Sequence, residues 1–313
     1  MYTNKSPSSF NSQIIKRNIM LSVLIFLSVS ILAGIPIFII YGIHSKRNNE
    51  QKELIKAWES GDFETTYTMS QSALEEKPMD YFLLTVHGFS AFQLGVSQIN
   101  NSDTLIFIDD SIWSLRKALL IKDSGKDGQI YYVLGKAYYY KGDDYADLAI
   151  EYLEKARNIS YEAADIPEYL GLSYARTGDY RSSVQAFSLA LSPSDSRPSD
   201  LLLLAIARSY ASLNELESAK AYLIRCIEVS RDSITTVTAQ LFLAGILTST
   251  GDTDGAEKQY LEIIELSGDN AEAYYQLGEI YLQRGDIVRA RAQWRLALRT
   301  DPGHAKARAR MYP

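Results

Sequence analysis

Histidine and cysteine are scarce in this chain of 313 residues, which contains three histidines and a single cysteine, Cys226. One thiol excludes a disulfide within the chain and a zinc site built from cysteines. The histidines His44, His87 and His304 lie far apart in sequence and form no His-x-x-x-His or His-x-Glu spacing. Metal-ion and acid–base chemistry therefore have few candidate side chains, and we expect neither an enzyme nor a bound metal or cofactor.

Acidic residues are absent from the first 47 residues, which carry five Lys and Arg side chains. The rest of the chain holds 27 basic and 38 acidic residues, and the net charge of the whole chain is −6. Because contacts with phosphates need clustered Lys and Arg, this acidic body argues against nucleic acid as a partner. A hydrophobic content of 46% with 22% charged residues is ordinary for a folded chain.

Residues 19–43 form a run of 25 residues without a charged side chain. As a helix this run would span about 37 Å, more than the ~30 Å hydrocarbon core of a bilayer. It is longer than the apolar region of a secretory signal peptide and ends in bulky side chains, so we expect a retained single-pass anchor rather than a cleaved peptide. Residues 1–18 form a short polar and basic tail before it.

The flanks of this run predict its orientation only by a small margin. Lys5, Lys16 and Arg17 precede it, whereas Lys46 and Arg47 follow it. The positive-inside rule then favours an N-terminus on the inside. We expect an anchor in the inner or cytoplasmic membrane, with residues 44–313 on the extracytoplasmic side.

Turn-forming residues recur through the body at a nearly constant interval. Stepping back from Gly285, similar residues lie at intervals of 34, 37, 36 and 36 positions, at Gly251, Asn214, Gly178 and Gly142. Gly95 and Gly61 extend the series, and small residues such as Gly135 and Gly278 lie seven positions before a turn. Gly and Asn tolerate the left-handed conformation that ends a helix, and small side chains let two helices approach closely. The pattern predicts stacked pairs of antiparallel helices that share one core.

The last unit resembles the tetratricopeptide repeat, through Tyr274, Leu277, Gly278, Tyr281, Gly285, Ala290, Trp294, Ala297 and Pro302. The resemblance extends over residues 48–304. It implies an all-α fold, a right-handed α-solenoid of about seven tetratricopeptide-type helix hairpins, here preceded by one transmembrane helix. The expected units are 47–80, 81–127, 128–163, 164–199, 200–236, 237–270 and 271–304.

Two departures from the repeat pattern occur in the first half of the array. The second unit has an insertion near residues 96–110, for which we expect a loop or a helix extension. The third unit needs a short insertion before Ala149. At the other end, the residues from Arg284 onward are strongly basic, which fits either a solvated capping surface or a contact with an anionic partner.

In tetratricopeptide arrays the first helix of each hairpin lines a concave groove, so the resemblance also implies where a partner polypeptide binds. The expected groove residues are Tyr132, Lys136, Tyr139, Tyr140, Arg176, Arg208, Tyr275 and Glu279. Aromatic and Arg side chains in a concavity commonly carry binding energy. The alternative is that these tyrosines, among 22 in the chain, only close gaps between helices.

Three functions are compatible with this pattern. The first is a membrane-anchored scaffold that binds partner polypeptides in the groove, within an envelope assembly, secretion or folding complex. The second is a structural component that associates with its own copies, as in a ring around a flagellar motor. The third is a regulatory subunit of an envelope enzyme. The first needs no catalytic group, and we expect it.

Overall fold

The computed structural model describes residues 49–98, 101–122, 127–191 and 198–312. These residues form fifteen α-helices and one short 3-10 helix, η1, and contain no strand. The predicted all-α class is confirmed for them. The predicted tail and anchor, residues 1–18 and 19–43, lie outside the described residues. Within the described ranges, no helix is both long and apolar enough to cross a bilayer.

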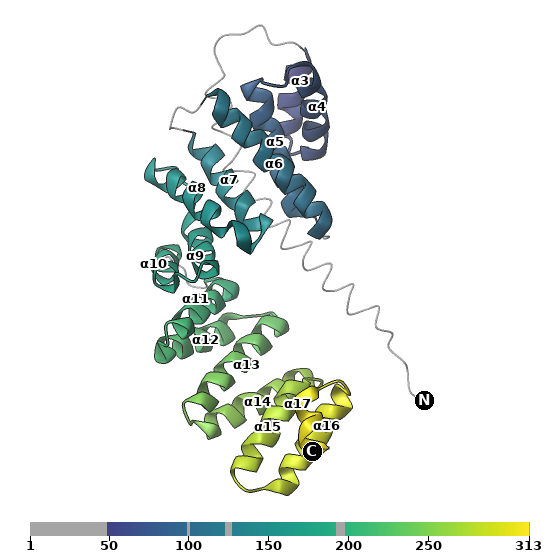
Figure 1. The fold of residues 1–313 in the computed structure, drawn as a ribbon, viewed down its shortest axis with the longest axis vertical. Helices are drawn as coiled ribbons and strands as arrows, with labels where there is room; N and C mark the ends of the chain where they lie inside the picture. The colour runs from purple at the N-terminus through teal and green to yellow at the C-terminus, as the bar shows by residue number, and fades with distance from the viewer. Residues whose placement is uncertain (1–48, 99–100, 123–126, 192–197, 313) are drawn as a thin grey trace, which may run out of the picture. The chain divides into compact units, whose positions relative to one another are not determined.

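The chain divides into two compact units, Met1–Gly178 and Asp179–Pro313. The first unit contains α3 (Asn49–Glu59), α4 (Phe63–Glu76), α5 (Tyr81–Ser97), α6 (Asn101–Ile121), α7 (Gly128–Lys141), η1 (Asp143–Tyr145), α8 (Ala146–Asn158) and α9 (Ile166–Arg176). The second contains α10 (Tyr180–Ala190), α11 (Asp200–Ser212), α12 (Leu216–Val229), α13 (Ser233–Ser249), α14 (Thr253–Ser267), α15 (Ala271–Gln283), α16 (Ile287–Thr300) and α17 (Ala305–Met311). Within each unit consecutive helices pack side by side, as α5 and α6 do in Figure 1.

At four of the turns a glycine ends one helix and the aspartate directly after it caps the next. The glycine ends the first helix with a positive φ, which is +77° at Gly285 and similar at Gly61, Gly178 and Gly251. The aspartate that follows caps the next helix, because its side chain accepts a hydrogen bond from the backbone N–H three residues on, as Asp286 does from Arg289. Asn214 has a φ of 60° and takes the place of the glycine before α12. These turns confirm the predicted role of the repeated Gly and Asn positions.

Small residues mark the places where two helices of a pair approach closely. A Cβ added to Gly135 would lie 2.5 Å from Cγ of Leu153, on the next helix. At Gly278 the added atom would collide with the indole of Trp294. Ala290 and Ala297 on α16 and Cys226 on α12 are fully buried. The predicted packing role of these small side chains is confirmed, and Cys226 is one of them.

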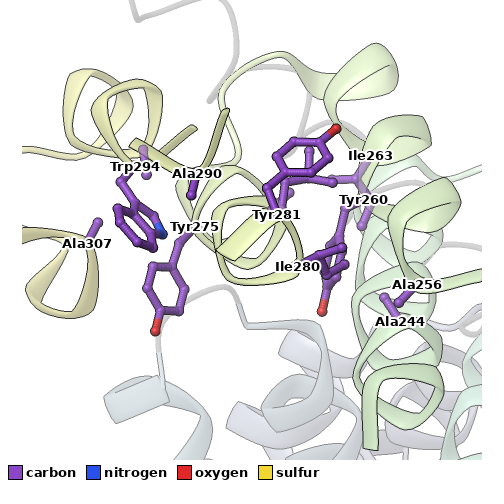
Figure 2. Packing of buried hydrophobic residues seen from close by; sticks show 13 residues of the cluster. Ala244, Ala256, Tyr260, Ile263, Tyr275, Ile280, Tyr281, Ala290, Trp294 and Ala307 are labelled. Carbon is purple, nitrogen blue, oxygen red and sulfur yellow. The ribbon is translucent and has the colours of Figure 1, made fainter. Parts of the chain in front are cut away.

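One core cluster of the second unit joins its last two helix pairs, α13 with α14 and α15 with α16, to the C-terminal helix α17. Figure 2 shows the indole of Trp294 beside Ala307, which is fully buried although it belongs to the short helix α17. Tyr260 and Tyr281 fill the space between α14 and α15, and both are at least 93% buried. α17 therefore covers the last apolar face of the repeat array, as a capping helix does.

One turn predicted from the glycine series is wrong. Gly95 lies inside α5, which continues to Ser97. A Cβ at this position would lie 3.0 Å from Cδ1 of Ile108. Gly95 therefore allows α6 to pack closely against α5, and it does not end α5. Most of the insertion near residues 96–110 is a helix extension, because α6 begins at Asn101. The short insertion before Ala149 contains η1.

Candidate functional site

An aromatic cluster lies where α5, α7 and α9 meet in the first unit. It consists of Phe92, Tyr132, Tyr139, Tyr140 and Tyr169. These helices are the first members of successive pairs, the helices that line the concave face in tetratricopeptide arrays. The cluster surrounds the ammonium group of Lys136, whose Nζ is 4.4 Å from the ring centroid of Tyr169 and 5.0 Å from that of Tyr132. Cation–π attraction of this kind strengthens when the cation is removed from water, and Lys136 is only 2% exposed.

Lys136 is neutralised within the cluster by Asp165, which directly precedes α9. Nζ of Lys136 donates a hydrogen bond to Oδ2 of Asp165 at 2.7 Å and another to the hydroxyl of Tyr132 at 3.1 Å. The same tyrosine hydroxyl donates to Asp165, at 2.8 Å from Oδ1. Burial, together with the charge of Asp165, raises the pKa of Tyr132 well above its usual range. Tyr132 and Lys136 therefore lie below the surface, and their polar atoms are occupied by each other and by Asp165.

The outer layer of the cluster is formed by Tyr139, Tyr140, Tyr169 and Arg176. The hydroxyls of Tyr140 and Tyr169 are 2.8 Å apart, and the rings of Tyr139 and Tyr169 meet edge to face at 5.1 Å. The guanidinium of Arg176 stacks 3.8 Å above the ring of Tyr139, and its Nε pairs with Asp143 at 3.1 Å. This layer offers aromatic area with polar edges, which is typical of surfaces that bind polypeptides.

Glu168 adds a negative charge beside this layer. It lies on α9, one residue before Tyr169, and it is partly buried. Burial, and then the neighbouring charge of Asp165, raises the pKa of the Glu168 carboxyl above its usual range. Among the residues that the structure describes, no cation forms an ion pair with Glu168. The charge of Lys136, which is paired with Asp165, offsets the raised pKa of Glu168 only in part. A basic group from another molecule would relieve the cost of burying this charge.

The predicted groove residues of the second unit have different surroundings. Arg208 on α11 is exposed. Tyr275 and Glu279 on α15 are instead in contact with the C-terminal segment. The ring of Tyr275 lies 5.3 Å from that of His304, and Glu279 accepts hydrogen bonds from Arg310 at 3.0 and 2.5 Å. Arg284 also forms ion pairs, with Asp254 and Glu257. Part of the basic charge from Arg284 onward is therefore neutralised by acidic residues of the same unit.

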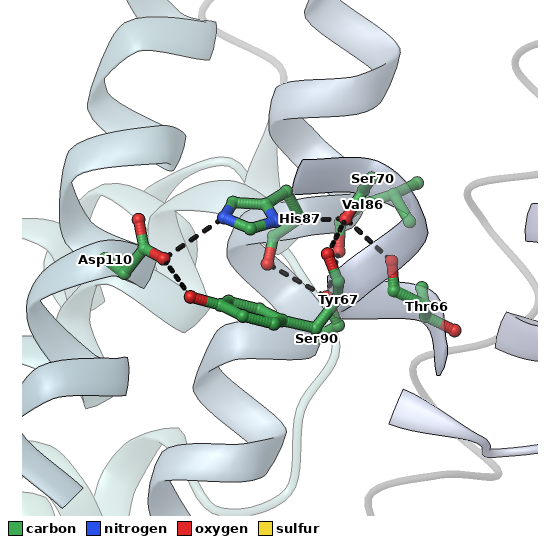
Figure 3. Close-up of polar contacts among 7 residues, drawn as sticks. All are labelled: Thr66, Tyr67, Ser70, Val86, His87, Ser90 and Asp110. Carbon is green, nitrogen blue, oxygen red and sulfur yellow. Dashed lines mark hydrogen bonds and ion pairs between the residues drawn. The ribbon is translucent and has the colours of Figure 1, made fainter. Parts of the chain in front are cut away.

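Ser70, His87 and Asp110 form a polar cluster that resembles the side-chain set of a hydrolase (Figure 3). Nδ1 of His87 is 3.0 Å from Oγ of Ser70, and Nε2 is 3.1 Å from Oδ2 of Asp110. The hydroxyl of Tyr67 also donates to Asp110, at 2.6 Å, while its ring stacks on His87. Burial alone would raise the pKa of Asp110, but the hydrogen bonds from His87 and Tyr67 hold it below its usual value.

This cluster is a packing element rather than a catalytic site. Ser70 is fully buried, and its Oγ lies 2.7 Å from the carbonyl oxygen of Thr66, so no substrate can reach it. The sequence does not reveal this cluster, because its three members come from three helices at irregular spacings. In the described part of the chain, no group of three or more His, Cys, Asp or Glu residues is placed to hold a metal ion.

The family of the chain follows from a match to the model for the tetratricopeptide repeat-like domain, which covers residues 152–311. This is just over half of the sequence, and the chain belongs to this family. Its members are generally non-enzymatic interaction modules. No curated protein sequence matches the chain significantly.

Solved structures with the same fold come from several repeat proteins. The C-terminal part of a tetratricopeptide repeat-containing protein from Cytophaga hutchinsonii aligns with a TM-score of 0.63 at 16% identity, over 82% of this chain and 97% of that one. YrrB, described as a protein of this family with an unusual peptide-binding site, aligns with a TM-score of 0.51 at 20% identity, over 64% and 98%. The pilF protein of Pseudomonas aeruginosa gives 0.52 at 16% identity, over 72% and 96%. At these identities the likeness shows the fold alone.

Proposed function

We propose that this chain is a membrane-anchored scaffold that holds a segment of another polypeptide on the face formed by α5, α7 and α9. The observation that carries the proposal is the outer layer of the aromatic cluster. There, Tyr139, Tyr169 and Arg176 present rigid, amphipathic side chains on helices rather than on loops. Such side chains lose little entropy when a partner orders them. The family supports this function, because tetratricopeptide-type repeats are generally interaction modules.

The charge of the site narrows the chemistry of the partner. Glu168 is partly buried, carries a raised pKa, and has no ion-pair partner in the described part of the chain. A partner segment that places a Lys or Arg side chain beside Glu168 and against the ring of Tyr139 or Tyr169 would gain both an ion pair and a cation–π contact. We therefore propose a basic segment as the ligand of this face.

The test begins with crosslinking of the full-length chain in cells, followed by identification of the partner and measurement of its affinity for purified protein. We expect Tyr139→Ala and Glu168→Gln each to weaken binding at least about tenfold, since such a loss corresponds to roughly 1.4 kcal/mol at a binding hot spot. Tyr180→Ala, a tyrosine of α10 that is not part of the aromatic cluster, serves as the matched control. Equal affinities for the parent and for both cluster variants would refute the assignment of this face.

The anchoring part of the proposal rests on residues 19–43, which contain no charged side chain. Membrane attachment would raise the effective concentration of the scaffold for partners at the same surface. We propose an inner or cytoplasmic membrane with the repeat array on the extracytoplasmic side. Alkaline extraction of membranes should leave the full-length chain in the membrane fraction, and a reporter fused after Pro313 should be active only on the extracytoplasmic side. Release of the chain by alkali would contradict the anchor, and a reporter active inside would contradict the orientation.

A further inference from the structure

The outer face of α6 exposes a row of large apolar side chains. Ile106, Trp113 and Leu120 are 64%, 63% and 83% exposed, and they follow one another at intervals of seven residues. This interval places all three on one face of the helix. The opposite face holds Ile108 and Leu115, which are fully buried in the first unit. α6 therefore has two apolar faces, of which one is packed in the core of the first unit and the other is exposed.

Trp113 makes this row stand out from ordinary surface side chains. The chain has three tryptophans, and Trp58 and Trp294 are only 5% and 4% exposed. A large aromatic ring left in water between two exposed aliphatic side chains is typical of a protein interface. Leu105 and Ile121, which are the sequence neighbours of Ile106 and Leu120, are also 41% and 39% exposed.

The charges on this face are arranged symmetrically about Trp113, with opposite signs on its two sides. Asp109 lies four residues before the tryptophan, whereas Lys117 lies four residues after it and Arg116 three residues after it. Ile106 and Leu120 lie seven residues before and after it. An antiparallel copy of the same helix, with its own Trp113 at the centre, would set Ile106 against Leu120 of the second copy. It would also set Asp109 against Lys117 of the second copy.

We propose that this face of α6 pairs with the same face of a second copy of the chain, as an antiparallel two-fold interface centred on Trp113. A two-fold interface must be self-complementary, and this face meets that condition in both apolar contact and charge. The proposal concerns the opposite side of α6 from the packed core and does not depend on the groove or on the anchor.

The charged side chains of the face remain available for this contact. Asp109 pairs with Lys141 through Oδ1 at 2.7 Å, yet 56% of its side chain is exposed. Nζ of Lys117 lies 3.8 Å above the ring of Trp113, so this cation lies beside the centre of the proposed contact. A bilayer surface fits less well than a second copy, because Asp103 and Asp109 would face anionic head groups.

The proposed interface is small, and its strength depends on concentration. From Leu105 to Ile121 the face extends about 24 Å along the helix, which is short for a stable dimer. We therefore expect a reversible dimer in dilute solution. Confinement to a membrane surface, if the anchor is present, would strengthen it.

Cysteine crosslinking of the full-length chain tests the register directly, because the single native Cys226 is fully buried. A mixture of Ile106→Cys and Leu120→Cys chains should give a crosslinked dimer with a short bis-maleimide. Each variant alone should give little product, since the two-fold axis would hold two copies of either position about 21 Å apart along the helices. Val288→Cys, on an equally exposed residue of α16 at 79% exposure, is the control and should give no product.

A second, independent test exchanges charges across the proposed interface and measures the mass of each variant in solution. Asp109→Lys should weaken the dimer at least fivefold, and adding Lys117→Asp to the same chain should restore it, whereas Trp113→Glu should abolish it. The absence of a crosslink in the mixture, or a mass unchanged by Trp113→Glu in a chain with the helical content of the parent, would overturn the proposal. If the crosslink is absent and brominated lipids quench Trp113 in liposomes, the face binds the bilayer and the proposal is likewise overturned.

Discussion

Lys136 and Asp165 form an ion pair between two successive helix pairs, with 2.7 Å between Nζ and Oδ2. The two partners differ in their access to water, because the side chain of Lys136 is 3% exposed and that of Asp165 is 31% exposed. The pair lies directly beneath the proposed binding face and fixes the position of α9 relative to α7. The shape of that face thus depends on a buried charge.

The unequal burial of this pair predicts unequal effects of removing either partner. Asp165→Asn leaves the ammonium of Lys136 buried without a counter-ion, and we expect the free energy of unfolding to fall by about 3 kcal/mol. Lys136→Met should cost less, because water can still reach Asp165. Denaturant unfolding of the purified full-length chain in detergent measures both. Equal losses, or a larger loss for Lys136→Met, would contradict the assigned roles.

Two glycines in helices predict opposite outcomes of the same substitution. Gly135→Ala places a Cβ 2.5 Å from Leu153, so overpacking should lower the free energy of unfolding by about 1–3 kcal/mol. Gly245 lies within α13, and a Cβ added there meets no atom within 4 Å. Gly245→Ala should therefore raise the free energy of unfolding by about 0.5–1 kcal/mol through helix propensity. Thermal melts followed by circular dichroism compare the two, and a stabilising Gly135→Ala would contradict the packing described here.

The raised pKa of Glu168 predicts how stability changes with pH. Burial, reinforced by Asp165, makes the folded chain hold this proton more tightly than the unfolded chain, whose carboxyl titrates near 4.5. The folded state then binds more protons, so this residue lowers stability as the pH rises from 4.5 through the folded pKa. Glu168→Gln should melt above the parent at pH 7, and the difference should shrink as the pH falls below 4.5.

A matched control separates this effect from a general change in charge. Glu162→Gln removes an exposed carboxylate a few residues before α9, and its melting temperature should follow that of the parent at every pH. If Glu168→Gln destabilises the chain at pH 7, the carboxylate has a stabilising partner and the proposed basic ligand loses its support. Glu168→Gln is also expected to weaken partner binding. A gain in stability together with a loss of affinity would show that Glu168 serves binding and not the stability of the fold.

The sequence predicted the repeated features of the fold because each has a strong local cause. Gly285 and Asn214 end helices in the left-handed conformation, and Ala290 and Ala297 allow close helix packing, as their spacing indicated. Gly95 was predicted wrongly as a turn, since a glycine can serve either a turn or a close approach of two helices. Only the position of Ile108, on the following helix, decides between these two roles.

The candidate site was predicted less completely, because spacing gives the face of a helix but not what covers it. Tyr139 and Arg176 stack on each other in the outer layer. Lys136, on the same face of α7, is covered by rings from α5 and α9. Tyr275 contacts a segment at the end of the chain whose path the repeat pattern does not specify. The contribution of Glu168 became clear only from the burial of its carboxyl and the neighbouring charge of Asp165.

The central claim is that a partner polypeptide lies against the face formed by α5, α7 and α9, and site-specific photocrosslinking in cells tests it most directly. Benzoylphenylalanine at Tyr139 keeps an aromatic ring in the outer layer, and the same group at Glu151, an exposed residue of α8, is the control. The account predicts a discrete crosslinked partner from position 139 that is absent from position 151 and lost when Glu168→Gln is added. No adduct at position 139, or the same adduct from both positions, would contradict it.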